Sequence, residues 1–268
     1  MLFLNTLFSS LIFAPFLLVS VLSPESLRGT IFFAPSSSWA THGYIIIKSC
    51  IVLCSWISAY FAIKHLPLTI IGPVKASQPM LVLMGALLIF GERLNLYQWL
   101  GVLLSIISFF LLSLAGKKEG INFKKDKWIF FLIISVITGA MSGLYDKYLM
   151  KRLDVMTVQA WYNIYQLVIM FFVLMLVWYP SRKKTTAFEW RWAIVFISIF
   201  ISMADFVYFY ALTFSDSMIS IVSMIRRSNV ILTFIAGALI YREKNLKTKA
   251  FDLFLVLLGM FLLYLGSR

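Results

Sequence analysis

The chain contains nine apolar segments, each long enough to cross a lipid bilayer as a helix. They cover residues 1–22, 41–63, 67–90, 97–115, 128–148, 156–179, 190–214, 217–241 and 250–266. The hydrocarbon core of a bilayer is about 30 Å thick, and a helix needs about 20 residues to cross it. A backbone in lipid must satisfy its own hydrogen bonds, which favours helices. The sequence therefore predicts an all-α, polytopic membrane protein of about nine transmembrane helices.

The composition excludes a soluble domain and a disordered chain. Hydrophobic residues make up 61% of the sequence and charged residues only 13%, whereas a soluble domain has about 25% charged residues. A net charge of +13 would indicate nucleic-acid binding in a soluble protein. Here it reflects membrane topology, so we expect membrane lipids around the chain and no nucleic acid.

The basic residues of the loops predict an orientation. Alternate loops hold 14 Lys and Arg on one side of the membrane and 6 on the other. Cytoplasmic loops carry the excess of Lys and Arg, so the 14 should lie in the cytoplasm. This predicts a multi-pass protein of the plasma (cytoplasmic or inner) membrane, with its N-terminus in the cytoplasm and its C-terminus outside.

An internal repeat divides the sequence. Two windows align without gaps at an offset of 151 residues and place Lys75 on Arg226, Gln78 on Asn229 and Glu92 on Glu243. We expect a first repeat of four spans over 1–116, a basic cytoplasmic linker over 117–127, and a second repeat of five spans over 128–268. Five spans in a complete unit make the two units antiparallel, and secondary transporters with inverted repeats bind substrate near the midplane between them.

These motifs resemble a known family. An Ala-x-x-x-x-(x)-Pro pattern precedes an apolar run that ends at Gly91-Glu92, and Gly101 follows in the next helix; Glu243 and Gly259 occupy similar places in the second copy. The chain resembles the EamA-type drug/metabolite transporter (DMT) superfamily over its whole length. The resemblance implies ten transmembrane helices around a central cavity and transport by alternating access. This sequence departs from that plan because the first of the ten helices is missing from it; either the protein has nine spans, or the sequence starts downstream of the natural start.

Three basic residues fall deep inside predicted spans. Arg226 and Arg227 lie roughly 15 Å into their helix and Lys75 roughly 12 Å into its own, at 1.5 Å per residue. Placing a charge at the bilayer centre costs at least about 2.5–3.5 kcal/mol, so each of these basic residues should have a partner or a function that offsets the cost. Guanidinium groups suit phosphate and carboxylate. We therefore expect Lys75, Arg226 and Arg227 to bind an anionic group.

Neighbouring polar residues extend this predicted substrate site. Gln78 and Asn229 follow Lys75 and Arg226 by three residues and share their helix faces, and Ser223 lies on the adjoining face. The alternatives are a structural network between the cations and Asp205 or Asp146, or contact with lipid headgroups. Adjacent basic residues at this place also resemble the triose-phosphate translocator branch, on the evidence of Arg226 and Arg227 alone.

The span at 156–179 carries a second polar face. Gln159, Tyr162, Asn163 and Gln166 recur at helical spacing and could line the substrate path or form hydrogen bonds between helices. Asp205 is the candidate proton carrier, since a buried carboxylate can titrate; its alternative is a fixed salt bridge to an arginine. Lys48 could reach either the membrane interface or the cavity, and we expect the interface.

These observations predict a secondary transporter of a small organic anion, phosphorylated or carboxylated, with proton coupling or exchange (antiport). The alternatives are an exporter of amino acids or amphipathic metabolites and drugs, translocation of a lipid-linked phosphate, and a membrane scaffold. The sequence has no phosphate-binding Walker A loop and no zinc motif. We expect no cofactor, no metal and no enzymatic activity, and a monomer or homodimer.

Overall fold

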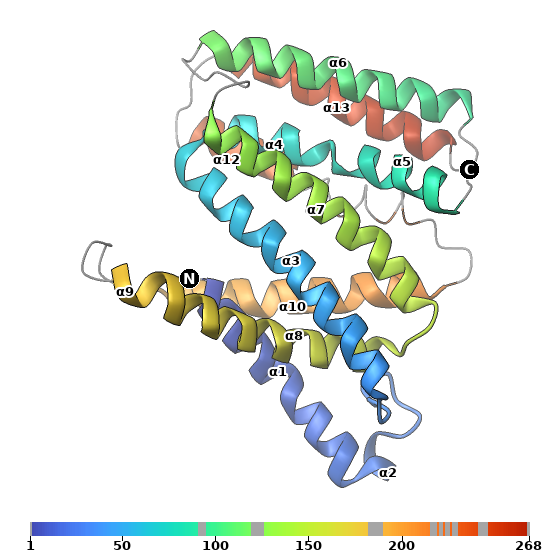
Figure 1. The fold of residues 1–268 in the computed structure, drawn as a ribbon. Coiled ribbons are helices and arrows are strands. Elements are labelled where there is room, and N and C mark those ends of the chain that lie inside the picture. Colours follow the sequence, from blue (N-terminus) through green and yellow to red (C-terminus); the bar gives the residue numbers. More distant parts are fainter. Residues whose placement is uncertain are drawn as a thin grey trace. The chain divides into compact units, whose positions relative to one another are not determined.

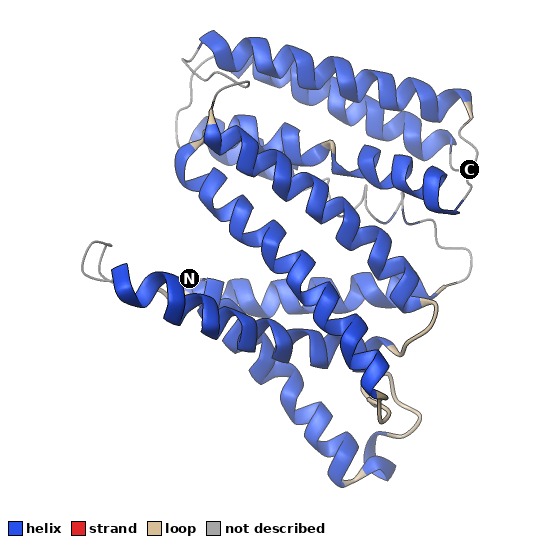
Figure 2. Ribbon diagram, in the orientation of Figure 1, coloured by secondary structure: helices blue, strands red, loops and turns tan. Residues whose placement is uncertain are grey.

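The computed structural model describes the chain over 2–90, 95–118, 126–181, 190–214, 230–240 and 246–266, together with residues 219, 222 and 226. Regular structure in these residues is helical throughout, and they contain no strand (Figure 2). The all-α prediction is therefore confirmed.

Each of the nine predicted segments contains at least one helix (Figure 1). In chain order, the long helices are α1 (Leu2–Leu22), α3 (Trp39–His65), α4 (Leu68–Ala76), α5 (Gln78–Phe90), α6 (Leu96–Lys118), α7 (Lys127–Met150), α8 (Val155–Val173), α10 (Ala193–Thr213), α12 (Val230–Leu239) and α13 (Leu246–Gly266). A short α2 (Pro24–Leu27) follows α1, and a π-helical turn, η1 (Leu174–Trp178), with α9 (Tyr179–Ser181), extends α8.

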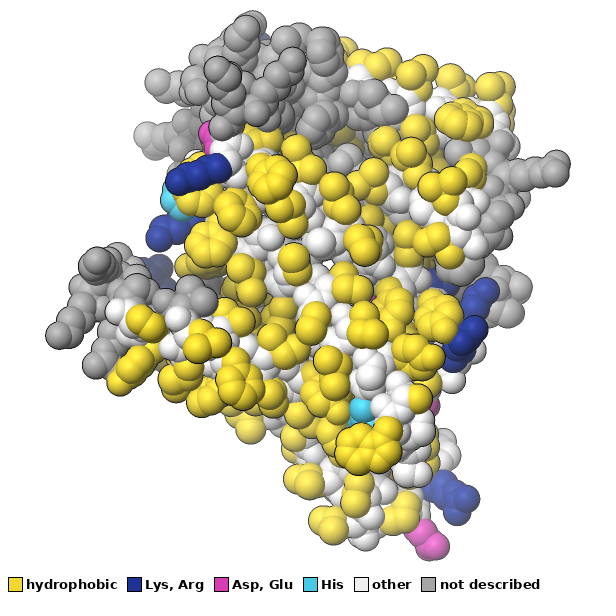
Figure 3. All heavy atoms as spheres, viewed as in Figure 1, with side chains coloured by type: hydrophobic (Ala, Val, Ile, Leu, Met, Phe, Trp, Pro, Cys, Tyr) yellow, Lys and Arg dark blue, Asp and Glu magenta, His cyan; other side chains and the backbone are white. Residues whose placement is uncertain are grey.

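Five of the described helices are long and apolar enough to cross a membrane: α1, α3, α7, α8 with its extension to Leu176, and α10. Two shorter apolar stretches, Gln78–Ile89 and Ala250–Gly266, lie in α5 and α13. Hydrophobic side chains cover most of the face in Figure 3. In lipid this surface requires no partner, because the acyl chains are as apolar as the side chains.

The third predicted span is two helices. The segment 67–90 breaks at Ser77, between α4 and α5. Pro79 explains the break, because proline lacks an N–H and its ring clashes with the carbonyl four residues earlier. Ser77 holds the turn, since its backbone N–H and its Oγ both donate to the carbonyl of Val74, at 3.3 and 2.7 Å.

The repeat extends over most of the chain. Shifted by 151 residues, α1 falls on 153–173, where α8 covers Val155–Val173. The same shift carries α3 onto 190–216, the region of α10, and α6 onto 247–269, the region of α13. The two-repeat architecture is thus visible in the helix bounds as well as in the sequence.

The chain forms two compact units that do not coincide with the repeats. Unit 1 comprises Met1–Leu53 and Tyr145–Ser215, and unit 2 comprises Cys54–Leu144 and Asp216–Arg268. Each unit therefore contains helices from both repeats. The exact repeat boundaries remain a prediction.

In unit 1, α1 packs against α8 and α10, and α8 packs against α10. Phe13, Ala34, Met156 and Ala160 form a small apolar core there. The Asp154 side chain begins α8 by accepting a hydrogen bond from the N–H of Thr157 at 3.0 Å. This N-cap fixes where the polar face of α8 starts.

In unit 2, α6 lies beside its counterpart α13 (Figure 1). Asn95 bonds the carbonyl of Gly266, and Ser108 bonds Asp252, so the two helices run antiparallel, as inverted repeats require. A Cβ on Gly101 would lie 2.7 Å from the carbonyl oxygen of Gly259. Only glycine permits so close an approach of the two backbones.

Two apolar clusters fill the interior of unit 2. One comprises Ala62, Leu66, Ile70, Ile71, Val74, Ile129, Leu132 and Val136. The other comprises Leu83, Val102, Leu253, Val256, Met260 and Leu263.

Candidate functional site

The polar interior of the described chain is concentrated in unit 1. Of the 23 polar or charged side chains that are buried in the described parts of the chain, 15 belong to unit 1. Hydroxyl and amide groups come from α1, α8 and α10, and charged groups come from α3, α7 and α10. A membrane protein keeps such groups inside only where they find partners or serve function.

The centre of this interior is a buried ion pair. The Nζ of Lys48, on α3, donates to Oδ1 of Asp146, on α7, and the two residues are 1% and 3% exposed. The expectation that Lys48 reaches the membrane interface is therefore wrong. A buried ammonium is stabilised by the carboxylate that accepts its hydrogen bond, and this contact outweighs the reach of the flexible stem toward water.

Two aromatic rings complete the surroundings of Lys48. Its Nζ lies 4.7 Å from the ring centroid of Tyr162, on α8, and 4.4 Å from that of Phe209, on α10. The two rings meet edge to face at 6.3 Å. Ring faces attract a cation, most strongly where water is excluded. We refer to Lys48, Asp146, Tyr162 and Phe209 as the Lys48 cluster.

Hydrogen bonds hold Tyr162 in place. The Nε2 of Gln166 donates to its phenolic oxygen at 2.9 Å, and the Oγ of Ser49 lies 3.4 Å from its backbone carbonyl. On the same helix face, Nδ2 of Asn163 donates to the carbonyl of Gln159 at 2.8 Å, and Ser10 of α1 donates to the carbonyl of Asn163 at 2.8 Å. The polar face predicted for α8 is thus buried, with hydrogen bonds both within the helix and to α1 and α3.

Asp205 lies in the same unit, buried on α10. It precedes Phe209 by four residues, so the two share a helix face. One turn earlier, the Oγ of Ser202 donates to the Oγ of Ser9 at 2.9 Å. The role of Asp205 as a proton carrier remains a prediction.

Two buried amides in unit 1 have atoms without a hydrogen-bond partner among the described residues. Neither Nε2 nor Oε1 of Gln159 has a hydrogen-bond partner among these residues, and neither does Oδ1 of Asn5. An unsatisfied buried polar group costs about 1–3 kcal/mol. A water molecule or a polar ligand that formed hydrogen bonds with these atoms would remove that cost.

Unit 2 holds the other described residues of the predicted site. Lys75 is half-buried in the last turn of α4, and Gln78 is buried at the start of α5, so both flank the break at Ser77. A Cβ on Gly139 would lie 2.8 Å from Oε1 of Gln78, so α7 leaves room for this amide only because it has glycine there. Arg226 is exposed.

Three residues of the predicted site, Ser223, Arg227 and Asn229, lie outside the described residues. The substrate role of the others, Tyr162, Asn163 and Gln166 in unit 1 and Lys75, Gln78 and Arg226 in unit 2, remains a prediction.

The balance of buried charge bears on the prediction that Lys75, Arg226 and Arg227 bind an anion. Among the described residues, three carboxylates are buried, those of Asp146, Asp205 and Asp252, but Lys48 is the one buried cation. Asp252 is 1% exposed and accepts a hydrogen bond from Ser108 at 2.6 Å. Among the described residues buried carboxylates therefore outnumber buried cations, which weakens the prediction that the site binds an anion.

Sequence reasoning did not anticipate the pairing of Lys48 with Asp146. The two residues are 98 positions apart, and neither has a charged neighbour at helical spacing within its span. The available signal was the cost of leaving a basic residue inside a span, which requires an acid on another helix.

Comparisons with known proteins agree with this architecture. The model of the EamA-like transporter family matches residues 1–114 and 126–265. One solved structure, whose description says only that it is the crystal structure of a protein, aligns with this chain at a TM-score of 0.67 and 13% sequence identity. The alignment covers 100% of this chain and 88% of the other chain. At that identity the likeness shows the fold alone. No curated protein matches the chain. Since the family match covers nearly the whole sequence in two segments, the chain belongs to the EamA-like transporter family.

Proposed function

We propose that this membrane transporter moves a small organic anion by alternating access. The observation that carries the proposal is the interrupted helix α4–α5, with Lys75 in the turn before the break and Gln78 in the turn after it. Discontinuous helices form the substrate sites of many secondary transporters, and the positive end of a half-helix points at anionic groups. The 13-residue α5 presents its N-terminus at this break.

The repeat supports a matching contribution from the second half. Arg226 occupies the position of Lys75, shifted by 151 residues, and belongs to the same unit. In this proposal Lys75 and Arg226 bind the phosphate or carboxylate of the substrate, and Gln78 accepts or donates a hydrogen bond. Arg227, Asn229 and Ser223 are proposed to complete the site.

Binding experiments test this assignment. Purified protein should be stabilised against heat by succinate or glycerol phosphate, and proteoliposomes should exchange the same compound. Arg226→Gln and Lys75→Gln should each weaken binding by roughly 10- to 150-fold, because a charge-assisted hydrogen bond contributes about 1.5–3 kcal/mol. Lys151→Gln, at an exposed position, is the control. Unchanged affinity in both site variants would remove the anion assignment.

We propose Asp205 as the group that couples transport to a proton. Its support is a buried position in unit 1, on the helix face of α10 that also carries Ser202 and Phe209. Asp205→Asn should abolish gradient-driven uptake of succinate but leave exchange intact, because exchange needs no net proton movement. Loss of both activities together with loss of folded protein would indicate a structural salt bridge.

The buried carboxylates of unit 1 favour a second candidate, the export of amino acids. An amino acid brings an ammonium group as well as a carboxylate, and Asp146 and Asp205 could attract it. Stabilisation by lysine or threonine, without stabilisation by succinate or glycerol phosphate, would select this candidate.

The proposed orientation places the linker 117–127 in the cytoplasm and Arg268 outside, from the loop charges alone. A C-terminal reporter that is active only in the cytoplasm should be silent. A strong signal would reverse the orientation without affecting the fold.

A further inference from the structure

We infer that the Lys48 cluster is a binding site for a primary ammonium group, occupied by the protein's own lysine, and that an amino acid binds there by inserting between Lys48 and Asp146. The ammonium of the amino acid takes the place of Nζ beside Asp146, and its carboxylate binds the displaced Nζ. The inference deepens the second candidate function, the export of amino acids, and rests on it for the identity of the ligand.

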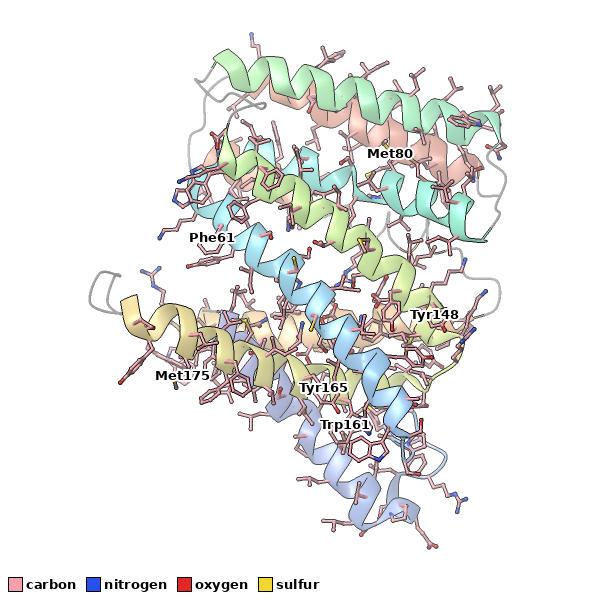
Figure 4. All side chains as sticks on the ribbon, in the orientation of Figure 1. Phe61, Met80, Tyr148, Trp161, Tyr165 and Met175 are labelled. Atoms are coloured by element: carbon pink, nitrogen blue, oxygen red, sulfur yellow. The ribbon has the colours of Figure 1, made fainter. Side chains whose placement is uncertain are left out.

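The surroundings of Nζ are those that recognise a primary ammonium group. Asp146 accepts its hydrogen bond, and the ring centroids of Tyr162 and Phe209 lie 4.7 and 4.4 Å away. Every member of the cluster is at most 3% exposed. A carboxylate and two aromatic rings, shielded from water, attract any ammonium group, whether it belongs to a lysine side chain or to a ligand. Figure 4 shows α3, α8 and α10 with their side chains in this part of unit 1.

The carboxylate and the rings are positioned by helices other than that of Lys48. Asp146 belongs to α7, Tyr162 to α8 and Phe209 to α10, whereas Lys48 reaches them from α3. Gln166 donates to the phenolic oxygen of Tyr162 at 2.9 Å, and the Tyr162 and Phe209 rings meet edge to face at 6.3 Å. These contacts do not involve Lys48, so they persist when Nζ withdraws. The flexible four-carbon stem of lysine permits that withdrawal.

Insertion of an amino acid leaves the net charge of the buried site unchanged. Lys48 and Asp146 together are neutral, and so is the zwitterion. After insertion, ammonium groups and carboxylates alternate, and no charge is separated from an opposite charge, which is what makes a broken buried ion pair costly. A ligand with only an ammonium would bring that group against Nζ, and a ligand with only a carboxylate would separate Asp146 from its cation. The site therefore selects zwitterions over simple amines and simple acids.

Gln159 is an independent indication of a ligand. It is 0% exposed and precedes Tyr162 by three residues, so both lie on the same face of α8. Neither Nε2 nor Oε1 of Gln159 has a hydrogen-bond partner among the described residues. A side-chain amide both donates and accepts hydrogen bonds, and so does the hydroxyl of an amino acid such as threonine. In this inference Gln159 binds the side chain of the ligand.

Complementation with a free amine tests the ammonium site. Lys48→Ala removes the side chain beyond its β-carbon, and the removed part has the size and charge of propylammonium. Propylammonium at about ten times its dissociation constant should raise the unfolding temperature of this variant by roughly 3–6 °C. Propan-1-ol, which has the same shape without the charge, should not. The control is Lys48→Ala/Asp146→Asn, which has the same space without the carboxylate and should not respond to propylammonium.

Threonine and its derivatives test the insertion in the parent protein. Threonine should raise the unfolding temperature. Threonine amide lacks the carboxylate and N-acetylthreonine lacks the ammonium, so each should bind roughly 10- to 150-fold more weakly. Lys48→Met/Asp146→Asn buries no unpaired charge from the pair and should lose threonine binding by a similar factor. Gln159→Leu should weaken the binding of threonine more than that of glycine, which has no side chain.

Failure of the inference and failure of amino-acid export give different results. Equal effects of propylammonium and propan-1-ol on Lys48→Ala would overturn the ammonium site. If Lys48→Ala does not fold, the parent and Lys48→Met/Asp146→Asn decide: equal threonine binding by both would overturn the inference and leave amino-acid export standing. Stabilisation of Lys48→Ala by propylammonium, with no binding of threonine, lysine or glycine to the parent, would uphold the ammonium site and refute amino acids as the ligand.

Discussion

The two compact units solve the packing problem of membrane helices in different ways. In unit 1, helices meet through hydroxyls, amides and the Lys48–Asp146 ion pair. In unit 2, they meet mainly through apolar clusters and through close backbone contact at Gly101, with hydrogen bonds from Asn95 and Ser108 between α6 and α13. The stability of unit 1 should therefore depend mainly on paired polar groups, and the stability of unit 2 mainly on the close fit of apolar side chains. Substitutions that remove one partner should damage unit 1, and substitutions that change volume should damage unit 2.

The largest effect should come from stranding a charge in unit 1. Lys48→Met leaves Asp146 buried without its cation, which should lower the free energy of unfolding by about 3–5 kcal/mol at neutral pH. Thermal unfolding of the purified protein in detergent measures it. Lys151→Met, at an exposed position, should change it by less than about 0.5 kcal/mol. Equal stability of the two variants would contradict the dependence of unit 1 on paired charge.

A cavity in unit 2 should have the next largest effect. Leu132 is fully buried in an apolar cluster, so Leu132→Ala should cost about 2–5 kcal/mol. The matched variant Leu132→Met nearly keeps the volume and should cost less than about 1.5 kcal/mol. If the two variants unfold at the same temperature, shape does not govern this cluster.

A single added methyl group tests the contact between α6 and α13. Gly101→Ala places Cβ against the backbone oxygen of Gly259 and against Leu263, and should cost about 1–3 kcal/mol. Gly43→Ala is the control on α3: nothing lies within 4 Å of its Cβ, so it should stabilise the helix by roughly 0.5–1 kcal/mol. The essential result is that Gly101→Ala lowers stability and Gly43→Ala raises it. A loss of stability in both variants would contradict a specific need for glycine at the contact between α6 and α13.

The smallest effect should come from one hydrogen bond in unit 1. Tyr162→Phe removes the acceptor of the Gln166 amide and should cost about 1 kcal/mol. Adding Gln166→Leu removes the stranded donor, so the double variant should regain part of that loss. Additive losses, measured on the same thermal assay, would show that the two side chains do not depend on each other.

The sequence predicts the helices well because hydropathy and length alone determine which segments cross a bilayer. It also predicts the repeat, whose offset of 151 aligns helices throughout the chain. It did not predict the break at Ser77 as a division of one span, although Pro79 carries the signal.

The partners across helices were beyond the reach of the sequence. Lys48 and Asp146 meet because α3 and α7 lie close together at that point, and no pattern within either helix encodes this contact. The same holds for Ser108 and Asp252 on α6 and α13. Helical periodicity identifies which residues share a face, but a contact also depends on which helix covers that face.

The antiparallel pairing of α6 and α13 bears on how such a chain diverges after duplication. The shift of 151 residues carries Gly101 onto Asp252 and Ser108 onto Gly259, so at this offset Gly259 is the counterpart of Ser108 and not of Gly101, the place that the family pattern suggested. The glycine contact at one end and the Ser108–Asp252 hydrogen bond at the other are therefore the same pair of positions, present twice. In an ancestral pair of identical halves, one substitution would have altered both ends at once. Within a single chain the two ends have separated, and one now depends on the absence of side chains while the other depends on a hydrogen bond between two of them.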